Sequence, residues 1–476
     1  MNTNIPLLIA LLLAIGCTHT KPSPTTQQSE ESPLTPPPTP ATQPAPADYT
    51  RIADEIESAL NRDVVRAFFP ACIDHTFGGF HSAFNRDWSR APSQGKGIVY
   101  QSRQTWIASQ LALQRPQLRD EFLAITRHGL KFLKNTMWDK SYGGFYWQLN
   151  DDGSLPQRPQ ASEKLLYGES FGIYASASAY LATRDPDALE LALLAFQWLD
   201  QHAHDPKNGG YFEVLARDGS PIRTQTPPTP SSRFHNSGFH YNYKSQNSHI
   251  HILEALTTLY TASKDPKVRV RLEEIFLIVR DRIVVPPGCL NLFFTPDWRP
   301  VPDHDSYGHD IETAFLLLEA SESLSPPRPL NSSTLEPLNS DAKTLAIARM
   351  LVDHTLDWGF DNQIGGVYDR GFALAPAFDK KKTWWTQVEA LNSLLLMHEH
   401  FGHQSDRYWQ AFLKQWNYIK NHQIDPQFPG FFADTEPDGK PLPGQKSQNW
   451  KAAYHDGRAF LQTTARLRHL ASTPPH

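Results

Sequence analysis

Apolar residues recur at the spacing of α-helices along most of the chain. Ile252, Leu256 and Leu259 are one example of this spacing. Residues 189–199 are apolar on almost every side, which predicts a helix buried on both faces. The Asp-Pro pair at 185–186 provides an N-cap and a first-turn proline for that helix. We therefore expect a mainly helical protein.

A short pattern repeats through the chain after residue 49. It consists of an Asp, three further residues, Gly-Gly and a large apolar or aromatic residue. It begins at Asp74, Asp139, Asp205, Asp361 and, in a weaker form, Asp425. Its period of about 65 residues is the length of two helices and their connections. A degraded unit without the glycines fits at 289–294, which makes six units.

Repeated helix pairs can share one continuous core by closing into a ring. We therefore predict an all-α fold, an (α/α)6 toroid of six helical hairpins formed by residues 49–476. Residues 143–153 and 209–219 run from Gly-Gly to Asp-Gly, which predicts short β-hairpins. Because both hairpins hold the same place in the repeat, they should lie at one end of the ring.

The first residues carry the signs of export. Residues 5–15 form an apolar run that is too short to span a bilayer and fits a signal peptide. The run ends in Leu-Ala-Ile-Gly-Cys, which resembles a bacterial lipobox. We expect a lipoprotein signal peptide at 1–16, a lipid on Cys17 and a Pro-rich linker at 17–48. The protein would then be anchored to a membrane on its periplasmic or extracellular face. Thr18 in place of an Asp retention signal favours the outer membrane.

Composition excludes several classes of partner. The chain has 45 Lys and Arg against 50 Asp and Glu and no Lys/Arg-rich run, so nucleic acid is excluded. Hydrophobic residues make up 39% of it, enough for a large core. Beyond Cys17 only Cys72 and Cys289 remain, too few for a disulfide scaffold or a multi-Cys metal site. They could pair or stay free. We expect a monomer.

Unusual polar and aromatic residues gather near the start of the second helix of each unit. They are Arg103; Tyr167; Asn247, His251 and Glu254; His309 and Glu312; Trp384, Trp385 and Glu389; and Trp450, His455 and Arg458. Equivalent positions in a ring of hairpins lie at one end, so these side chains should converge on one pocket. A lone Arg or His at a helix start is more often a cap or a satisfied polar group. Glu169 and His249, at the same phase, could therefore be structural.

The spacing of two histidine–carboxylate pairs limits the chemistry. His251 and Glu254, like His309 and Glu312, are spaced i to i+3 and share a helix face. That geometry permits a metal site with imidazole and carboxylate ligands. It also permits acid–base chemistry in which a carboxylate orients a histidine. Aromatic residues and an Arg in the same pocket suit a sugar whose developing negative charge meets a guanidinium. We favour acid–base chemistry on a sugar.

Four segments carry a specific resemblance. NSHIHILEA at 247–255, SYGHDIE at 306–312, WWTQVEA at 384–390 and YHDGR at 454–458 are similar to segments of the N-acylglucosamine 2-epimerase superfamily, and within it of the cellobiose 2-epimerases. The resemblance spans roughly residues 49–470 and implies the (α/α)6 fold already predicted.

The resemblance also implies roles for the pocket residues. The catalytic histidines would be His251, His309 and His455. The sugar would be bound or oriented by Arg103, Asn247, Glu254, Glu312 and Glu389, stacked on by Trp385 and Trp450, and supported through Arg458. Tyr167 and Trp384 join the substrate-binding set through their place in the repeat.

The implied reaction inverts C2 of the reducing-end sugar of a β-1,4 disaccharide such as cellobiose or mannobiose. A histidine assists ring opening, a base removes the C2 proton, a cis-enediolate forms, and a proton returns on the opposite face. His455 and His251 would move the C2 proton, and His309 would assist opening. No metal ion or organic cofactor is required. With an ordinary histidine pKa near ~6.5, activity should fall on the acid side of neutrality.

Three other functions stay open. An aldose–ketose isomerase of the mannose isomerase type shares the enediolate but delivers the proton to C1. A glycoside hydrolase on the same toroid would need two carboxylates flanking a glycosidic bond. An oligosaccharide-binding lipoprotein would not need histidines in its pocket. The three histidines at the pocket phase favour proton transfer over hydrolysis or binding alone.

Overall fold

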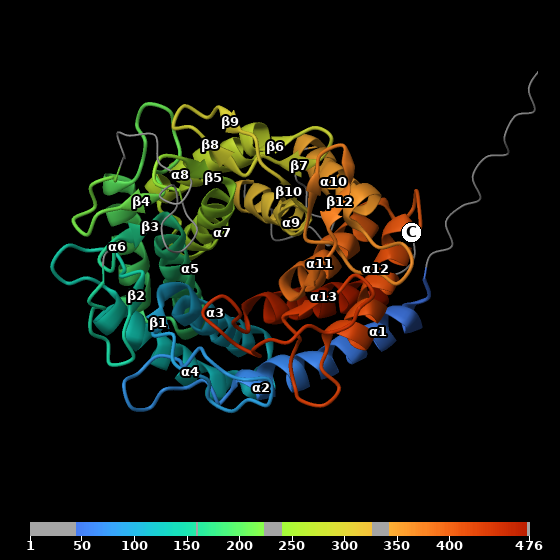
Figure 1. Cartoon of the computed structure of the whole chain (residues 1–476), viewed down its shortest axis with the longest axis horizontal. Coiled ribbons are helices and arrows are strands. Elements are labelled where there is room, and N and C mark those ends of the chain that lie inside the picture. The colour runs from blue at the N-terminus through green and yellow to red at the C-terminus, as the bar shows by residue number, and fades with distance from the viewer. Residues whose placement is uncertain (1–43, 159, 223–239, 326–341, 474–476) are drawn as a thin grey trace, which may run out of the picture. The chain divides into compact units, whose positions relative to one another are not determined.

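The helices form two concentric rings. The computed structural model describes residues 44–158, 160–222, 240–325 and 342–473. All of these residues belong to one compact unit (Figure 1). Among the described residues, the inner ring contains α3 (Ile98–Gln114), α5 (Leu166–Thr183), α7 (Gln246–Ser263), α9 (Tyr307–Leu324), α11 (Trp384–Phe401) and α13 (Tyr454–Ser472). The outer ring contains α1 (Pro46–Ala59), α4 (Arg119–Phe132), α6 (Pro186–His202), α8 (Pro266–Ile278), α10 (Ala342–His354) and α12 (Arg407–Tyr418).

The inner ring is closed. Each inner helix contacts the next one along the chain, and α13 contacts α3. The predicted toroid of six helical hairpins is therefore confirmed. The shorter helical segments of the described chain are α2 (Arg66–Phe68), the 3-10 turn η2 (Pro116–Leu118) and the π-helical turns η1 (Leu60–Val65), η3 (Leu133–Met137), η4 (Val279–Ile283), η5 (Thr355–Gly359) and η6 (Ile419–Gln423).

The inner helices are the ones buried on almost every side. Helix α5 is buried without a break from Leu166 to Ala179, and its Gly, Ala and Ser residues let neighbouring helices approach closely. Residues 189–199 belong instead to the outer helix α6, where Leu194 is 45% exposed. The expectation of a helix buried on both faces there is wrong, because one face of α6 packs against the inner helices α5 and α7 while the opposite face is exposed to solvent.

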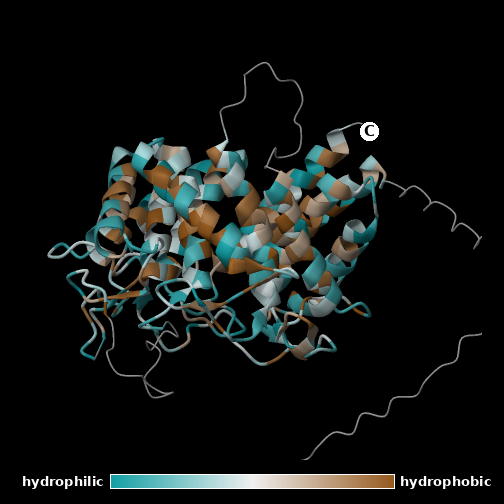
Figure 2. Ribbon diagram, turned by 90° about the horizontal axis from the view of Figure 1, so that it is seen from above, coloured by the Kyte–Doolittle hydropathy of each residue, from teal (hydrophilic) through white to brown (hydrophobic). Residues whose placement is uncertain are grey.

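The strands and connecting loops gather at one end of the rings, which we call the loop end (Figure 2). The described strands are β1 (Lys96–Gly97), β2 (Gln148–Leu149), β3 (Lys164–Leu165), β4 (Val214–Leu215), β5 (Lys244–Ser245), β6 (Val284–Val285), β7 (Cys289–Leu290), β8 (Phe293–Phe294), β9 (Pro300–Val301), β10 (Asp305–Ser306), β11 (Arg370–Phe372), β12 (Ala375–Asp379), β13 (Lys382–Thr383) and β14 (Asp434–Thr435).

Antiparallel strand pairs join consecutive repeats. β1 pairs with β2, β3 with β4, β5 with β8, β10 with β11, and β13 with β14. A bridge between Phe84 and Ser447 links the last repeat to the first. In 143–153 the pairing therefore differs from the predicted hairpin, because β2 pairs with β1 of the preceding repeat. In 209–219, β4 pairs with β3, and Leu215 also bridges to Pro221 across the Asp-Gly turn.

The Asp of each Asp-x3-Gly-Gly loop faces a buried lysine. In the second repeat, Asp139 accepts the backbone N–H of Ser141 at 3.0 Å, which closes the loop. The lysine is at most 1% exposed and, in four of the five repeats that have it, stands two residues before the inner helix; Lys446 lies further upstream of α13. The five Nζ–carboxylate distances are 2.6 Å for Lys96–Asp74, 3.4 Å for Lys164–Asp139, 2.9 Å for Lys244–Asp205, 2.9 Å for Lys382–Asp361 and 3.0 Å for Lys446–Asp425. In the first, second, third and fifth repeats this pair fixes the loop to the start of the inner helix, and in the sixth it fixes the loop to the segment before α13.

The fourth repeat lacks this pair. The β6–β7 hairpin stands where the other repeats have the Gly-Gly loop, because Val284 pairs with Leu290 as Trp138 bridges to Phe145 in the second repeat. Residues 289–294 lack the glycines, as expected for the degraded unit. Asp305 stands two residues before α9, at the place of the lysine. Cys289 in β7 and Cys72 are both buried free thiols.

The predicted export segment falls largely outside the described residues. Cys17 and the signal peptide at 1–16 are not among them, and helix α1 begins at Pro46, inside the last residues of the predicted linker. None of the helices in the described part of the chain is both long and apolar enough to cross a membrane.

Replacing Lys382 by Met should strongly destabilise the ring. The substitution removes the ammonium from Asp361 and leaves the carbonyls of Gly365 and Pro437 without their donor. Breaking a buried ion pair on one side costs about 3–5 kcal/mol. Denaturant unfolding followed by circular dichroism measures the loss. Lys380→Met, on an exposed neighbour, is the control and should stay within ~0.5 kcal/mol. A loss as small as the control's would show that the pair does not hold the loop.

Candidate active site

A cavity of about 190 Å³ is formed by all six inner-helix repeats. Its lining residues are Arg103 from α3, Tyr167 from α5, Asn247 and His251 from α7, His309 and Glu312 from α9, Trp384 and Trp385 from α11, His455 from α13, and Trp450 just before α13. The structure therefore brings these ten residues together in one cavity, as the phase of the repeat predicts. The other three predicted residues, Glu254, Glu389 and Arg458, do not line the cavity but contact those that do.

Arg458 lies at the centre of a buried ionic cluster. Its Nη1 donates to Glu254 at 2.7 Å, and its Nη2 donates to Glu389 at 2.5 Å and also to Glu312. All four side chains are at most 2% exposed. Burial raises the pKa of Glu389 well above its ordinary value, and the Arg458 guanidinium opposes that rise. One guanidinium thus neutralises carboxylates from three different inner helices.

Two of these carboxylates orient histidines. His251 Nδ1 lies 2.9 Å from Glu254 Oε1, and His455 Nδ1 lies 2.6 Å from Glu389 Oε1. Both carboxylates also accept N–H groups of Arg458, so the histidine Nδ1 is the donor in each pair. This leaves Nε2 of each ring unprotonated and able to act as a base.

His309 is held differently. Its Nδ1 lies 2.8 Å from the hydroxyl of Ser306, not from a carboxylate. Glu312, one helical turn further on, contacts Arg458 instead. The expectation that the i to i+3 spacing pairs these two residues is therefore wrong, although both line the cavity. A hydroxyl can donate or accept, so this contact does not fix which ring nitrogen of His309 carries the proton.

Burial keeps all three histidines neutral. It lowers the pKa of His251 to about 3, with Arg103 and Arg458 adding to the effect while Glu312 opposes it. It lowers the pKa of His309 to about 3, helped by His251. His455 is lowered well below its ordinary value by burial and then by the positive charges of Arg103 and Arg458. The ordinary value near ~6.5 assumed from the sequence does not apply in this pocket.

Arg103 is fixed by four groups. Its Nη1 donates to the carbonyl of Trp450 at 3.0 Å and its Nη2 to the hydroxyl of Tyr167 at 3.0 Å. The guanidinium also lies over the rings of Phe171 and Tyr454, at 4.6 Å and 5.0 Å. Its Nε is buried and has no hydrogen-bond partner in the described residues. A preorganised cation of this kind can meet negative charge that develops on a bound molecule.

Aromatic rings surround the histidines. Trp385 lies 4.8 Å from His309 and 5.6 Å from His455 between ring centroids. Trp450 is 37% exposed and lies at the mouth of the cavity beside Tyr167, with ring centroids 5.8 Å apart. A second hollow of about 150 Å³ also has Trp450 in its wall. These flat apolar surfaces suit the faces of sugar rings.

Glu169 and His249 prove structural. Each accepts the backbone N–H of the residue that follows a Gly-Gly pair, Phe145 for Glu169 at 2.7 Å and Tyr211 for His249 at 3.1 Å. Gln101 and Gln387 hold the same place in their helices and accept the N–H of Phe80 and of Val367. The fourth position of these inner helices therefore anchors the loop and does not face the cavity.

Sequence reasoning missed residues that support the pocket. Ser306 contacts His309, and Tyr454 donates its hydroxyl to Glu254 at 2.7 Å while its ring lies 4.8 Å from that of His455. Phe171 lies 4.9 Å from His251. Tyr454 immediately precedes His455, but nothing in the repeat pattern distinguishes its side chain from an ordinary core aromatic residue.

Glu312, Glu389 and His455 come close enough together to hold a metal ion, with one ligand atom each within 4.8 Å of the others. Arg458 already donates to both carboxylates, so a cation would have to displace its guanidinium. We therefore assign no metal to this pocket.

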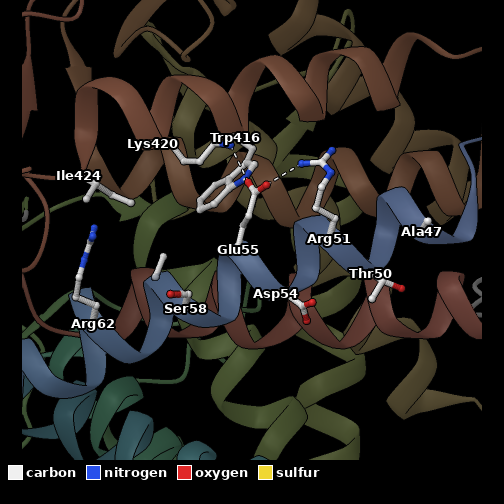
Figure 3. A pocket seen from close by; sticks show the side chains of 11 residues that line it. Ala47, Thr50, Arg51, Asp54, Glu55, Ser58, Arg62, Trp416, Lys420 and Ile424 are labelled. Atoms are coloured by element: carbon white, nitrogen blue, oxygen red, sulfur yellow. Dashed lines mark hydrogen bonds and ion pairs between the residues drawn. The ribbon is translucent and has the colours of Figure 1, made fainter.

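A larger hollow lies away from the histidines. It has a volume of about 930 Å³ and runs beside helix α1 and the end of α12 (Figure 3). Glu55 of α1 accepts from Trp416 Nε1 at 2.9 Å and from Lys420 Nζ at 2.7 Å, which ties the first outer helix to the last. Its eleven lining residues include no histidine. This hollow marks the seam of the outer ring, and the candidate chemistry lies in the smaller cavity.

Comparison with known proteins identifies close resemblances. Residues 78–459 match the family model of N-acylglucosamine 2-epimerase. A cellobiose 2-epimerase of Bacteroides fragilis is 27% identical over 413 residues, which cover 86% of this chain and 98% of that protein. A D-mannose isomerase of Marinomonas mediterranea is 23% identical, covering 82% of this chain and 91% of that protein. The solved structure of cellobiose 2-epimerase from Spirochaeta thermophila is 29% identical, with a TM-score of 0.75, covering 89% of this chain and 98% of that one.

The lowered pKa values predict that His251, His309 and His455 stay neutral as the pH falls through ~6.5. Nitrogen NMR of 15N-histidine-labelled protein, assigned with single His→Asn variants, should show a protonated Nδ1 and a bare Nε2 for His251 and His455. The exposed His403 serves as the reference signal. Protonation of the pocket histidines near pH 6.5 would contradict the assignment.

Proposed function

The chain belongs to the N-acylglucosamine 2-epimerase family and is a sugar epimerase or isomerase; on this premise we propose that it inverts C2 of the reducing-end sugar of a β-1,4 disaccharide such as cellobiose. The observation that carries the proposal is the pair of histidines His251 and His455, which line the same cavity as Arg103. A buried carboxylate holds each of the two rings in one tautomer. Two bases in one pocket are what inversion at a single carbon requires.

In the proposed reaction, the Nε2 of one neutral histidine takes the proton from C2 of the open-chain sugar. The C–H electron pair becomes the C1=C2 bond of a cis-enediolate, and negative charge moves to O1. Facing that negative charge, the second histidine takes up a proton from solvent at its own Nε2 and delivers it to the opposite face of C2, and the charge on O1 flows back to restore the carbonyl. The first histidine then releases its proton to solvent, which leaves both rings neutral again. His309 would assist ring opening.

The carboxylates stabilise each histidine once it has taken up a proton. In the free protein burial keeps the rings neutral, so they are ready to act as bases. Once a ring has taken the C2 proton, its Nδ1–H faces Glu254 or Glu389, which stabilises the imidazolium. Arg103 would meet the charge on O1. No step needs a metal ion or an organic cofactor.

Two neighbouring hollows support a disaccharide as substrate. The cavity with the histidines is about 190 Å³, and the adjoining hollow of about 150 Å³ shares Trp450 with it. A reducing-end sugar in the first would leave the second sugar to pass Trp450 into the other. The cellobiose 2-epimerases among the relatives carry the same implication in their names.

The competing functions are less well supported. An aldose–ketose isomerase would use the same pocket, and the likeness to D-mannose isomerase keeps it as the alternative. A glycoside hydrolase needs two carboxylates at the scissile bond, but Glu254, Glu312 and Glu389 all contact Arg458. A protein that only binds oligosaccharides would not need histidines oriented by buried carboxylates.

Reaction in heavy water tests the proposal directly. Cellobiose and mannobiose incubated with the protein should yield the C2 epimer with deuterium at C2, as seen by NMR. Deuterium at C1 of a ketose would select the isomerase, and release of monosaccharides would select the hydrolase. The absence of exchange with a panel of β-1,4 disaccharides would leave only the binding protein.

Replacing His251 or His455 by Asn should lower turnover by ~10²–10⁴-fold, because the amide can still donate to Glu254 or Glu389 but offers no base. His249→Gln is the matched control in the same helix. Gln already accepts the loop N–H at this place in two other repeats, so turnover should stay near that of the unmodified protein. Equal losses in all three variants would mean that the fold was disturbed. Because the histidine pKa values are lowered, the acid limb of activity should lie well below pH ~6.5.

We also propose that the mature protein begins at a lipid-bearing Cys17 and is held at the periplasmic or outer face of a membrane. The apolar run at 5–15, ending in Leu-Ala-Ile-Gly-Cys, supports this. In detergent phase partitioning the protein should enter the detergent phase, and Cys17→Ala should stay in the aqueous phase. Thr18→Ala, which keeps the Cys, is the control. Aqueous partitioning of the unmodified protein would refute the anchor.

A further inference from the structure

The fourth repeat carries a buried carboxylate where five other repeats carry a buried ammonium. In each of those repeats a lysine contacts a carboxylate: Lys96, Lys164, Lys244 and Lys382, which stand two residues before an inner helix, and Lys446, which lies further upstream of α13. Asp305 stands two residues before α9 and is 4% exposed. The substitution therefore inverts the charge at an interior position that otherwise holds a cation.

A second position of the repeat also carries an aspartate here. Asp310 is the fourth residue of α9, the position at which Gln101, Glu169, His249 and Gln387 accept the N–H that follows a Gly-Gly pair. In the fourth repeat the equivalent N–H is that of Leu290, after the β6–β7 turn, and it acts on Asp310 against the rise in its pKa. Among the described residues, none of the four buried carboxylate oxygens of Asp305 and Asp310 has a hydrogen-bond partner of normal length.

A histidine of the outer ring points its remaining nitrogen at these carboxylates. His354, at the end of α10, is 2% exposed, and its Nε2 donates to the carbonyl of Ala373 at 2.9 Å. Within the described part of the chain its Nδ1 has no hydrogen-bond partner, and it lies 3.6 Å from Asp305 Oδ2 and 3.7 Å from Asp310 Oδ2. A protonated Nδ1 would draw a carboxylate to hydrogen-bond distance, so these separations favour a bare nitrogen.

The separations suit metal coordination. Asp305, Asp310 and His354 offer one ligand atom each, all within 4.8 Å of one another. Ligands placed about 2.1 Å from a tetrahedral metal lie ~3.4 Å apart, slightly less than the distances found here. The Ala373 carbonyl fixes the ring so that Nδ1 faces the carboxylates, as partners behind metal-bound histidines do.

Without a cation, two buried carboxylates side by side are unfavourable. Burial and the neighbouring Asp310 raise the pKa of Asp305 to about 9, and burial raises that of Asp310 well above its ordinary value. A divalent ion would neutralise both charges and satisfy the histidine nitrogen. An imidazole ligand favours a first-row transition metal over calcium or magnesium.

We propose that Asp305, Asp310 and His354 bind a divalent transition-metal ion of the Zn²⁺ or Mn²⁺ kind, which takes the structural place of the lysine ammonium in the other repeats. The ion would join the strand before α9, the first turn of α9 and the end of α10. It has no part in the proposed proton transfer, because Asp310 and the neighbouring His309 belong to different sites: His309 lines the active-site cavity and Asp310 does not.

Metal analysis of the full chain tests the site. Protein purified without a metal-affinity column should contain about one equivalent of a transition metal by mass spectrometry. Chelator-treated protein should regain roughly 5 °C or more in unfolding temperature when one equivalent of Zn²⁺ or Mn²⁺ is added. No bound metal together with no thermal shift from either ion would overturn the proposal and indicate that Asp305 and Asp310 share a proton instead.

Asp305→Lys gives the sharpest comparison, because it restores the residue that the other repeats use. The variant should lose metal uptake and the thermal shift, while its unfolding temperature after chelation should equal or exceed that of chelated unmodified protein. His354→Gln should also lose uptake. Asp303→Asn, on an exposed carboxylate nearby, should bind metal like the unmodified protein. Metal uptake retained by Asp305→Lys would overturn the site, whatever the epimerase assay gives.

Discussion

The contact of Arg458 with Glu254, Glu312 and Glu389 is the interaction on which the pocket depends. The carboxylates come from α7, α9 and α11, and the guanidinium comes from α13, the helix that closes the inner ring. Three buried carboxylates without this cation would be strongly unfavourable. Glu254 and Glu389 also orient His251 and His455. Because Arg458 holds both carboxylates as hydrogen-bond acceptors, it also determines that Nε2 is the free ring nitrogen of each histidine.

The loops decide where that cluster can act. Buried Lys–Asp pairs fasten the loops of four repeats to the starts of their inner helices, and strand pairs join one repeat to the next, so the inner helix N-termini collect at the loop end. Tyr167, Asn247, His309, Trp384 and His455 all lie in the first turn of their helices. The positive ends of the helix dipoles therefore surround the cavity, which disfavours imidazolium in the free protein and favours an enediolate in the bound one.

The repeat made the ring and the gathering of polar side chains predictable from the sequence. Equivalent positions in equivalent hairpins must lie at one end, whatever the details of packing. The pattern could not distinguish residues that face the cavity from nearby residues on another face of the same helix. His249 and His251 look alike in the sequence, yet one accepts a loop N–H and the other lines the pocket. The spacing of His309 and Glu312 likewise suggested a pair, but Arg458, far along the chain, binds Glu312 instead.

The fourth repeat shows what a repeat pattern hides. From the sequence alone, its missing glycines suggest only a degenerate copy of the repeat. The sequence shows that the loop pattern is lost but not which hydrogen-bond and ion-pair partners that loop provides in the other repeats. The site becomes visible only when Asp305 is compared with the lysine of the other repeats and Asp310 with their N–H acceptor. Its third residue, His354, comes from an outer helix. The fourth repeat has lost both the loop aspartate and the lysine, which neutralise each other in the other repeats. The charges of Asp305 and Asp310 must therefore be neutralised by another group. A group of two carboxylates and a histidine, with its unpartnered atoms converging, is the chemistry of a site that a metal ion completes.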